Sequence, residues 1–182
     1  MKGIVFTEFL EMVEDRFTAA TADRMLEAVA LPSGGVYTSV GTYDSAEMVS
    51  LVKALSALVS VPVPDLLKAF GQHLFGQFVQ KFPGFFIGID GPETFLARVD
   101  GLVHVEVRKL YPDAELPTFA CEGGGPVPFA MTYRSPRNFP DLAEGLIVGC
   151  YSHFGQHVVI RREEAVGTPP AIRFVMSSPE PA

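Results

Sequence analysis

The feature that most constrains the fold is a change in hydrophobic spacing near residue 117. Before it, apolar residues recur at helical spacing, and after it short runs alternate between apolar and polar residues as β-strands do. A chain that forms helices first and short strands later is expected to separate a helical part from an antiparallel sheet. The sequence therefore predicts an α+β fold with a small sheet of about four strands.

Four helices are expected in the first half of the chain. Asp44 and Glu47 have the spacing of a capping box at the start of the third, and Asp65 is placed to cap the fourth. Proline and glycine clusters separate these segments. Apolar residues keep helical spacing over residues 4–17, 22–30, 49–58 and 66–78.

The second half is expected to supply the sheet. A turn from Gly123 to Pro126 separates two alternating runs and predicts a β-hairpin. No repeat or flexible linker divides the chain, so residues 1–182 are expected to form a single domain. The predicted strands cover residues 119–122, 129–133, 158–163 and 172–176, with a helix inserted over residues 142–154.

Composition excludes several classes of protein. The chain has 182 residues and is 48% hydrophobic, which is enough to bury a core of its own. Its net charge of −7 argues against a nucleic-acid partner, which would require clustered positive charge. Glu8, Glu11 and Glu14 interrupt the first apolar stretch, so neither a signal peptide nor a membrane span is expected there. We therefore expect a cytoplasmic protein with no membrane partner.

Tyr133, Ser135 and Arg137 stand at every second position of one stretch. If residues 129–137 are extended, the three side chains face the same way. Two hydroxyls and a guanidinium fork together suit an anionic group that needs several donors, such as a pair of carboxylates. The same residues could instead pack at a sheet edge, cap a turn and lie in solvent.

His104 lies in a stretch with two competing patterns. Val103, Val105 and Val107 alternate with polar residues, which indicates a strand, whereas the helical spacing from Phe95 onward would continue as a helix. In the helix, His104 would lie on or beside the apolar face. The local pattern alone leaves both structures open.

Other reactive side chains do not form a recognisable catalytic motif. Cys150 and His153 lie close together, but the chain lacks the G-x-S-x-G nucleophile elbow. His153 and His157 lack the glutamate of H-E-x-x-H, and His73 is interpreted as part of a polar helix face. With Cys121 the chain has two cysteines, too few for a cysteine metal site and expected to be buried thiols. No enzymatic activity is expected.

Four motifs together resemble the haem nitric oxide/oxygen-binding (H-NOX) family, which is related to the haem domain of soluble guanylate cyclase. They are VDGLVHVEVRKLYPD, LPTF, YRSPR and AEGLIVGCYSHF. The resemblance extends through MKGIVFTEFLEMVEDRF, YTSVGTYDSAEM and VPDLLKAFGQHLFGQF, and so covers nearly the whole chain. It implies haem b (iron protoporphyrin IX), buried between a helical lobe of about residues 1–62 and an α/β lobe of about residues 63–178.

The resemblance also implies roles for individual residues. His104 matches the proximal haem ligand, which this family carries on a helix. Tyr133, Ser135 and Arg137 match the motif that binds the haem propionates. Pro117 matches the proline that presses on the porphyrin and distorts it.

On the distal side, Leu142 falls where oxygen-binding relatives have a tyrosine, and Val5, Phe78 and Leu146 match other apolar positions. An apolar pocket disfavours stable O2 binding and leaves NO binding intact. The resemblance thus implies a sensor that binds NO and CO, and that signals in trans to a separately encoded histidine kinase or cyclic-di-GMP synthase or phosphodiesterase. The alternative is a haem-free small-ligand or protein-interaction module on the same fold.

Overall fold

The helices come first in the computed structural model, which describes residues 1–125, 127–167, 169 and 171–179. The first four are α1 (Gly3–Arg16), α2 (Ala19–Glu27), α3 (Ser45–Val59) and α4 (Val63–Lys81). The next segments are the 3₁₀ turn η1 (Pro83–Phe86), α5 (Pro92–Arg98), the π-helical turn η2 (Val99–Val103) and α6 (His104–Leu110). None of the described helices is long and apolar enough to cross a membrane alone, although α3 and α4 together pass by length and composition and meet at 111°.

The strands form one four-stranded antiparallel sheet, as the sequence predicts. Its order is β1-β2-β4-β3, so the last strand along the chain lies between two earlier ones. The elements are β1 (Thr118–Gly124), β2 (Val127–Arg134), α7 (Pro140–His153), β3 (Val159–Ala165) and β4 (Ala171–Ser177). Pro126, part of the predicted hairpin turn, lies outside the described residues. The predicted α+β fold is confirmed.

The predicted helix caps are only partly correct. Asp44 caps α3, because its side chain accepts a hydrogen bond of 2.9 Å from the backbone N–H of Ala46. Glu47 does not complete a capping box; it is buried and accepts hydrogen bonds from the hydroxyls of Ser33 and Tyr37. Asp65 does not cap α4, because the helix begins two residues earlier, at Val63, and Asp65 lies inside its first turn; Pro62 at the N-cap provides no side-chain hydrogen bond.

Residues 103–108 are helical, as the family resemblance implies. The π-helical turn η2 runs directly into α6, and His104 is the first residue of α6. The alternating valines predict a strand wrongly, because they do not mark a buried face: Val105 is exposed on the side of this short helix that the rest of the protein does not cover. The helical spacing that starts at Phe95 is the pattern that the chain follows.

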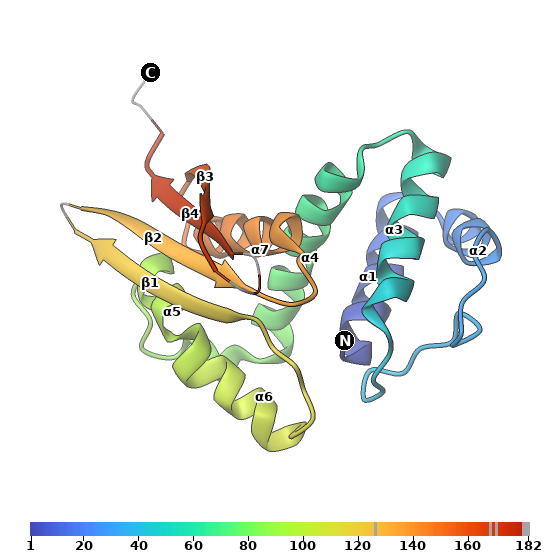
Figure 1. The fold of residues 1–182 in the computed structure, drawn as a ribbon, viewed down its shortest axis with the longest axis horizontal. Helices are drawn as coiled ribbons and strands as arrows, with labels where there is room; N and C mark the ends of the chain where they lie inside the picture. Colours follow the sequence, from blue (N-terminus) through green and yellow to red (C-terminus); the bar gives the residue numbers. More distant parts are fainter. Residues whose placement is uncertain (126, 168, 170, 180–182) are drawn as a thin grey trace.

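Two hydrophobic clusters share the helices α4 and α7. One cluster is formed mainly by α1, α2, α3 and the first half of α4, and the other by α5, α7 and the sheet. Figure 1 shows α4 between the group α1–α3 and the half of the molecule that holds the sheet. α4 and α7 cross closely at glycines: a Cβ atom on Gly145 would lie 2.2 Å from the backbone oxygen of Lys68, and one on Gly71 2.4 Å from that of Leu142.

Candidate functional site

His104 is held between a helix and the first strand of the sheet. Its side chain is buried, with 8% of the residue exposed, and its ring stacks on Phe119 at a centroid distance of 5.7 Å. The turn η2 places Asp100 beside it, with Oδ1 2.7 Å from Nδ1 of His104. The other oxygen of Asp100 accepts a 2.7 Å hydrogen bond from the backbone N–H of Phe119. Asp100 therefore ties the histidine to the start of β1.

The environment favours a neutral imidazole at His104. Burial lowers the pKa of His104 below its ordinary value, and the neighbouring Asp100 opposes this shift without reversing it. A carboxylate only accepts hydrogen bonds, so Nδ1 carries the proton and Nε2 keeps its lone pair. Nε2 makes no hydrogen bond to any of the described residues. This carboxylate–histidine pair has the arrangement that protein metal sites use to orient a histidine ligand.

Tyr133 and Ser135 are both buried near the end of β2. The hydroxyl of Tyr133 accepts a 3.0 Å hydrogen bond from the backbone N–H of Phe139, and that of Ser135 accepts one of 3.2 Å from Arg137 N. Among the described residues neither hydroxyl donates its own proton. Two buried donors are therefore left for an acceptor that the described residues do not supply.

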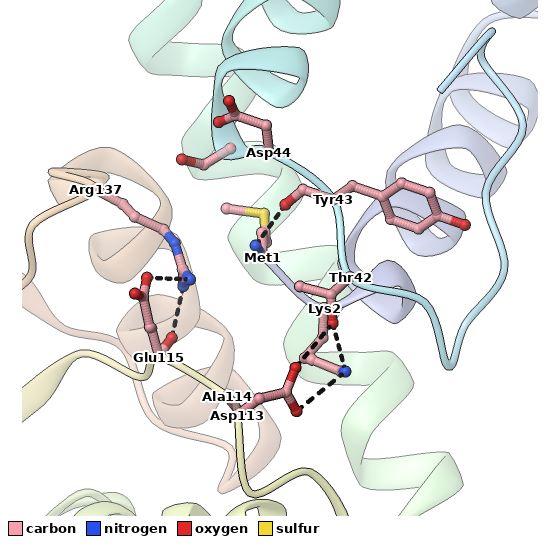
Figure 2. A pocket seen from close by; sticks show the side chains of 10 residues that line it. Met1, Lys2, Thr42, Tyr43, Asp44, Asp113, Ala114, Glu115 and Arg137 are labelled. Carbon is pink, nitrogen blue, oxygen red and sulfur yellow. Dashed lines mark hydrogen bonds and ion pairs between the residues drawn. The ribbon is translucent and has the colours of Figure 1, made fainter. Parts of the chain in front are cut away.

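Arg137 departs from the predicted extended row. β2 ends at Arg134, and the turn at Pro136 changes the direction of the chain before Arg137 is reached. The guanidinium instead donates to Glu115, with 2.6 Å to the backbone oxygen and 2.9 Å to Oε2. Figure 2 shows this pair at one side of a cavity of about 410 Å³ that Lys2 and Asp113 also line. Arg137 therefore lines this cavity, whereas Tyr133 and Ser135 are buried.

The four apolar residues predicted for the distal side meet in one hydrophobic cluster. Leu142 is buried, and the others, Val5, Phe78 and Leu146, are partly buried against the same cluster. They come from α1, α4 and α7, so three elements far apart in the sequence contribute to it. Pro117 is partly buried in the segment that joins α6 to β1.

Two tyrosines also border this cluster, and each hydroxyl makes a hydrogen bond outside it. Tyr37 donates a 2.8 Å hydrogen bond to the buried carboxylate of Glu47, and burial raises the pKa of Tyr37 to about 12. The hydroxyl of Tyr43 accepts a 2.8 Å hydrogen bond from the backbone N–H of Thr38. These interactions hold the Tyr37 hydroxyl at the first turn of α3 and the Tyr43 hydroxyl at Thr38, in the segment before α3.

The two cysteines and His153 pack at the hydrophobic cluster formed by α5, α7 and the sheet. Cys121 and Cys150 are free thiols; burial raises the pKa of Cys121 to about 11 and that of Cys150 further. Cys150 points its sulfur at the backbone oxygen of Pro92, and the ring of His153 packs among phenylalanines such as Phe86. In the described part of the chain, no three His, Cys, Asp or Glu side chains are grouped to hold a metal ion.

Sequence reasoning missed two residues of the site. Asp100 precedes His104 by four positions, a spacing that places two side chains on one helix face and that could have identified the pair. Glu115 gives no comparable signal, because it lies in an irregular segment and meets Arg137 only through the fold.

Known proteins resemble this chain over almost all of its length. The family model described as Haem-NO-binding (HNOB) matches residues 2–162. No curated protein sequence matches the chain significantly. The crystal structure of the Fe(II) unliganded H-NOX protein from K. algicida is 38% identical, with a TM-score of 0.89 over 100% of this chain and 98% of that chain.

Two further solved structures describe ligand-bound states of related proteins. The H-NOX protein from S. oneidensis in the Fe(II)NO state is 28% identical, with a TM-score of 0.88 over 99% of this chain and 100% of that chain. The IWP-051-bound H-NOX from Shewanella woodyi in the Fe(II)CO state is 38% identical, with a TM-score of 0.81 over 99% and 95%. The chain described here therefore belongs to the haem-NO-binding (H-NOX) family of haem-based gas sensors.

Proposed function

We propose that this protein is an NO sensor in which His104 is the only protein ligand to the iron of haem b. The observation that carries this proposal is the buried imidazole of His104, held through Nδ1 by Asp100 with Nε2 left without a partner. A neutral imidazole in that state offers one strong lone pair to a metal. The fit to haem is good because a single axial ligand is all that the cofactor requires from the chain.

The propionates are assigned to Tyr133, Ser135 and Arg137. The two buried hydroxyls have protons to donate, and Arg137 supplies a planar cationic fork at the mouth of the site. The pairing of Arg137 with Glu115 holds the guanidinium at the cavity of Figure 2, where charged carboxylates of a bound group would have access to water.

Gas selection is assigned to the apolar cluster around Leu142. When bound, ferrous haem supplies the metal centre at which NO and CO bind. Bound O2 gains stability from a hydrogen-bond donor, whereas NO and CO need none. Val5, Phe78, Leu142 and Leu146 have no donor to offer, and the nearby hydroxyl of Tyr37 already donates its proton to Glu47. A haem bound beside this cluster would therefore bind NO and CO and discriminate against O2.

The signal is assigned to a movement between the helical lobe, about residues 1–62, and the α/β lobe, about residues 63–178. His104 begins α6, and Asp100 joins it to the start of β1, just after Pro117. Loss of the His104 tether on NO binding would free α6 and relieve the contact at Pro117, which biases a two-state equilibrium between the lobes. The output is proposed to act in trans, on a histidine kinase or a cyclic-di-GMP synthase or phosphodiesterase, and not through catalysis by this chain.

The test is a His104→Gly variant with imidazole added back in solution. We expect the purified variant to lose haem unless imidazole is present, because the glycine leaves space for a free ligand but breaks the link to α6. The matched control is His157→Gly, which removes an exposed histidine and should retain one haem per chain. If His104→Gly kept the wild-type haem spectrum without imidazole, His104 would not be the ligand; if the wild type bound no haem, the haem-free module would be favoured.

A further inference from the structure

A charged residue is buried between α1 and α4. Glu8 on α1 is 1% exposed, and one of its oxygens accepts a hydrogen bond from the ammonium of Lys81 on α4. Its other oxygen, Oε2, has no hydrogen-bond partner in the described part of the chain. His73, also on α4, has its buried Nε2 3.9 Å from that oxygen and likewise without a partner. Two buried polar atoms thus face each other at 3.9 Å, beyond hydrogen-bond distance.

A buried carboxylate with one unpaired oxygen lowers the stability of the fold, but it helps to fix how α1 and α4 pack. A buried carboxylate costs free energy unless it is paired, and an apolar pair would often stabilise the same contact more. A buried ion pair favours one register of two packed helices, because the pair forms only when the carboxylate and the cation lie opposite each other. The contact between Glu8 and Lys81 therefore favours one register of α1 on α4.

This register bears on the gas-binding side. Val5 precedes Glu8 by about one helical turn on α1, and Phe78 precedes Lys81 by about one turn on α4. Both Val5 and Phe78 pack against the apolar cluster that contains Leu142. A shift of Glu8 along α4 would therefore move Val5 relative to Phe78.

We propose that Glu8, His73 and Lys81 form a polar junction that positions α1 on α4, and so Val5 against Phe78, and that proton uptake by His73 loosens this junction. Glu8 and His73 are positioning residues in this account. The link to gas binding rests on the proposed function, whereas the junction itself rests only on the contacts between α1 and α4.

The charges around His73 decide the direction of the pH effect. Burial lowers the pKa of His73 below its ordinary value, and this outweighs the opposing attraction of Glu8. The neutral form therefore belongs to the resting structure, and its contribution to stability is present above about pH 6.5 and is lost as the pH falls. The charged or titratable groups around it are Glu8, Glu11, Asp15, Arg16, Lys81 and, across the neighbouring cavity, His153.

A route to water is present beside His73. The residue lines a cavity of about 470 Å³ between α4 and α7, which Arg16 and Ser152 also border. A protonated His73 can gain hydration by turning toward this cavity, at the cost of its place opposite Glu8. Acid is thus expected to favour a state in which α1 is held less firmly.

The experiment compares wild type with His73→Gln, which keeps a polar neutral side chain that does not titrate. Thermal unfolding and CO dissociation from the ferrous haem protein are measured from pH 5.5 to pH 8. The wild-type Tm is expected to fall by about 2–5 °C more than that of His73→Gln across this range. CO dissociation from the wild type should accelerate at acid pH by about fivefold, the lower end of typical coupling, and that of the variant should not.

Matched controls separate positioning from simple stabilisation. His157→Gln, at an exposed histidine, should keep the wild-type pH profile, and Glu14→Gln, at an exposed glutamate of α1, should change nothing. Glu8→Gln should change CO dissociation at every pH. The proposal is overturned if His73→Gln keeps the wild-type pH profile, or if Glu8→Gln lowers the Tm but leaves CO dissociation unchanged.

Failure of the junction and failure of the proposed function give different results. If Glu8→Gln does not fold, the pH comparison with His73→Gln decides alone. If no version of the protein binds haem, the proposed function fails, but the pH dependence of Tm in the haem-free protein still tests the junction: an identical pH dependence in wild type and His73→Gln would refute it.

Discussion

Asp100 accepts two hydrogen bonds of 2.7 Å from groups that lie in different elements, Nδ1 of His104 and the backbone N–H of Phe119. Each of its oxygens serves one donor, so the orientation of the imidazole and the position of the first strand depend on the same carboxylate. A displacement of His104 would therefore be felt at β1 and at the neighbouring Pro117.

Replacing Asp100 with Asn tests this dependence. The variant keeps the size of the side chain but removes the negative charge opposite Nδ1, which lowers the basicity of the imidazole. We expect a lower iron–histidine stretching frequency in the resonance Raman spectrum of the ferrous protein. We also expect the affinity for haem to fall by roughly 10- to 100-fold. The exposed Asp90 provides the control Asp90→Asn. An unchanged stretching frequency in Asp100→Asn would show that the contact does not tune the ligand.

Among the helices, α4 and α7 link the two halves of the core, because both hydrophobic clusters contain residues from them. Their close crossing requires the absence of side chains at Gly71 and Gly145, where an added Cβ atom would meet backbone atoms at 2.4 Å and 2.2 Å. Backbone atoms cannot rotate away as the end of a flexible side chain can. The two helices would have to separate to admit even a methyl group.

Gly145→Ala is therefore expected to destabilise the protein by about 1–3 kcal/mol, as overpacked positions do. For a chain of this size that corresponds to a Tm lower by roughly 2–12 °C in thermal unfolding. The control is Gly76→Ala, also on a helix but with open space around the added Cβ. It should stabilise the protein by about 0.5–1 kcal/mol, because alanine loses less conformational freedom than glycine in a helix. Equal effects of the two changes would contradict this account of the crossing.

The elements that the sequence predicts well are those whose own side chains decide their structure. The apolar spacing of α1 and α4 and the glycine-rich turn between β1 and β2 are local signals, and the structure follows them. Asp65 misleads because α4 begins two residues before it, and the valines after His104 mislead because only part of α6 is covered by the rest of the protein. The partners of Glu115 and Glu8 lie in other elements, so no single segment of sequence reveals them, whereas Asp100 and His104 are four positions apart and could have been paired from the sequence.

At the scale of the whole molecule, the helical group α1–α3 meets the sheet-bearing part through the shared helices α4 and α7. The candidate ligand His104 belongs to one part, and Val5 belongs to the other. A group bound between them would touch both, so a change in its attachment to α6 can reach α1 without any change of fold. This arrangement suits a sensor whose output is a shift of one part against the other.

The decisive experiment is the absorption spectrum of the reduced, haem-loaded protein under argon, then in air, and then with NO. We expect a five-coordinate ferrous spectrum under argon, no change on prompt exposure to air, and a shift with NO. A stable complex with O2 would contradict the role given to the apolar cluster around Leu142, and a six-coordinate spectrum under argon would contradict His104 as the only protein ligand.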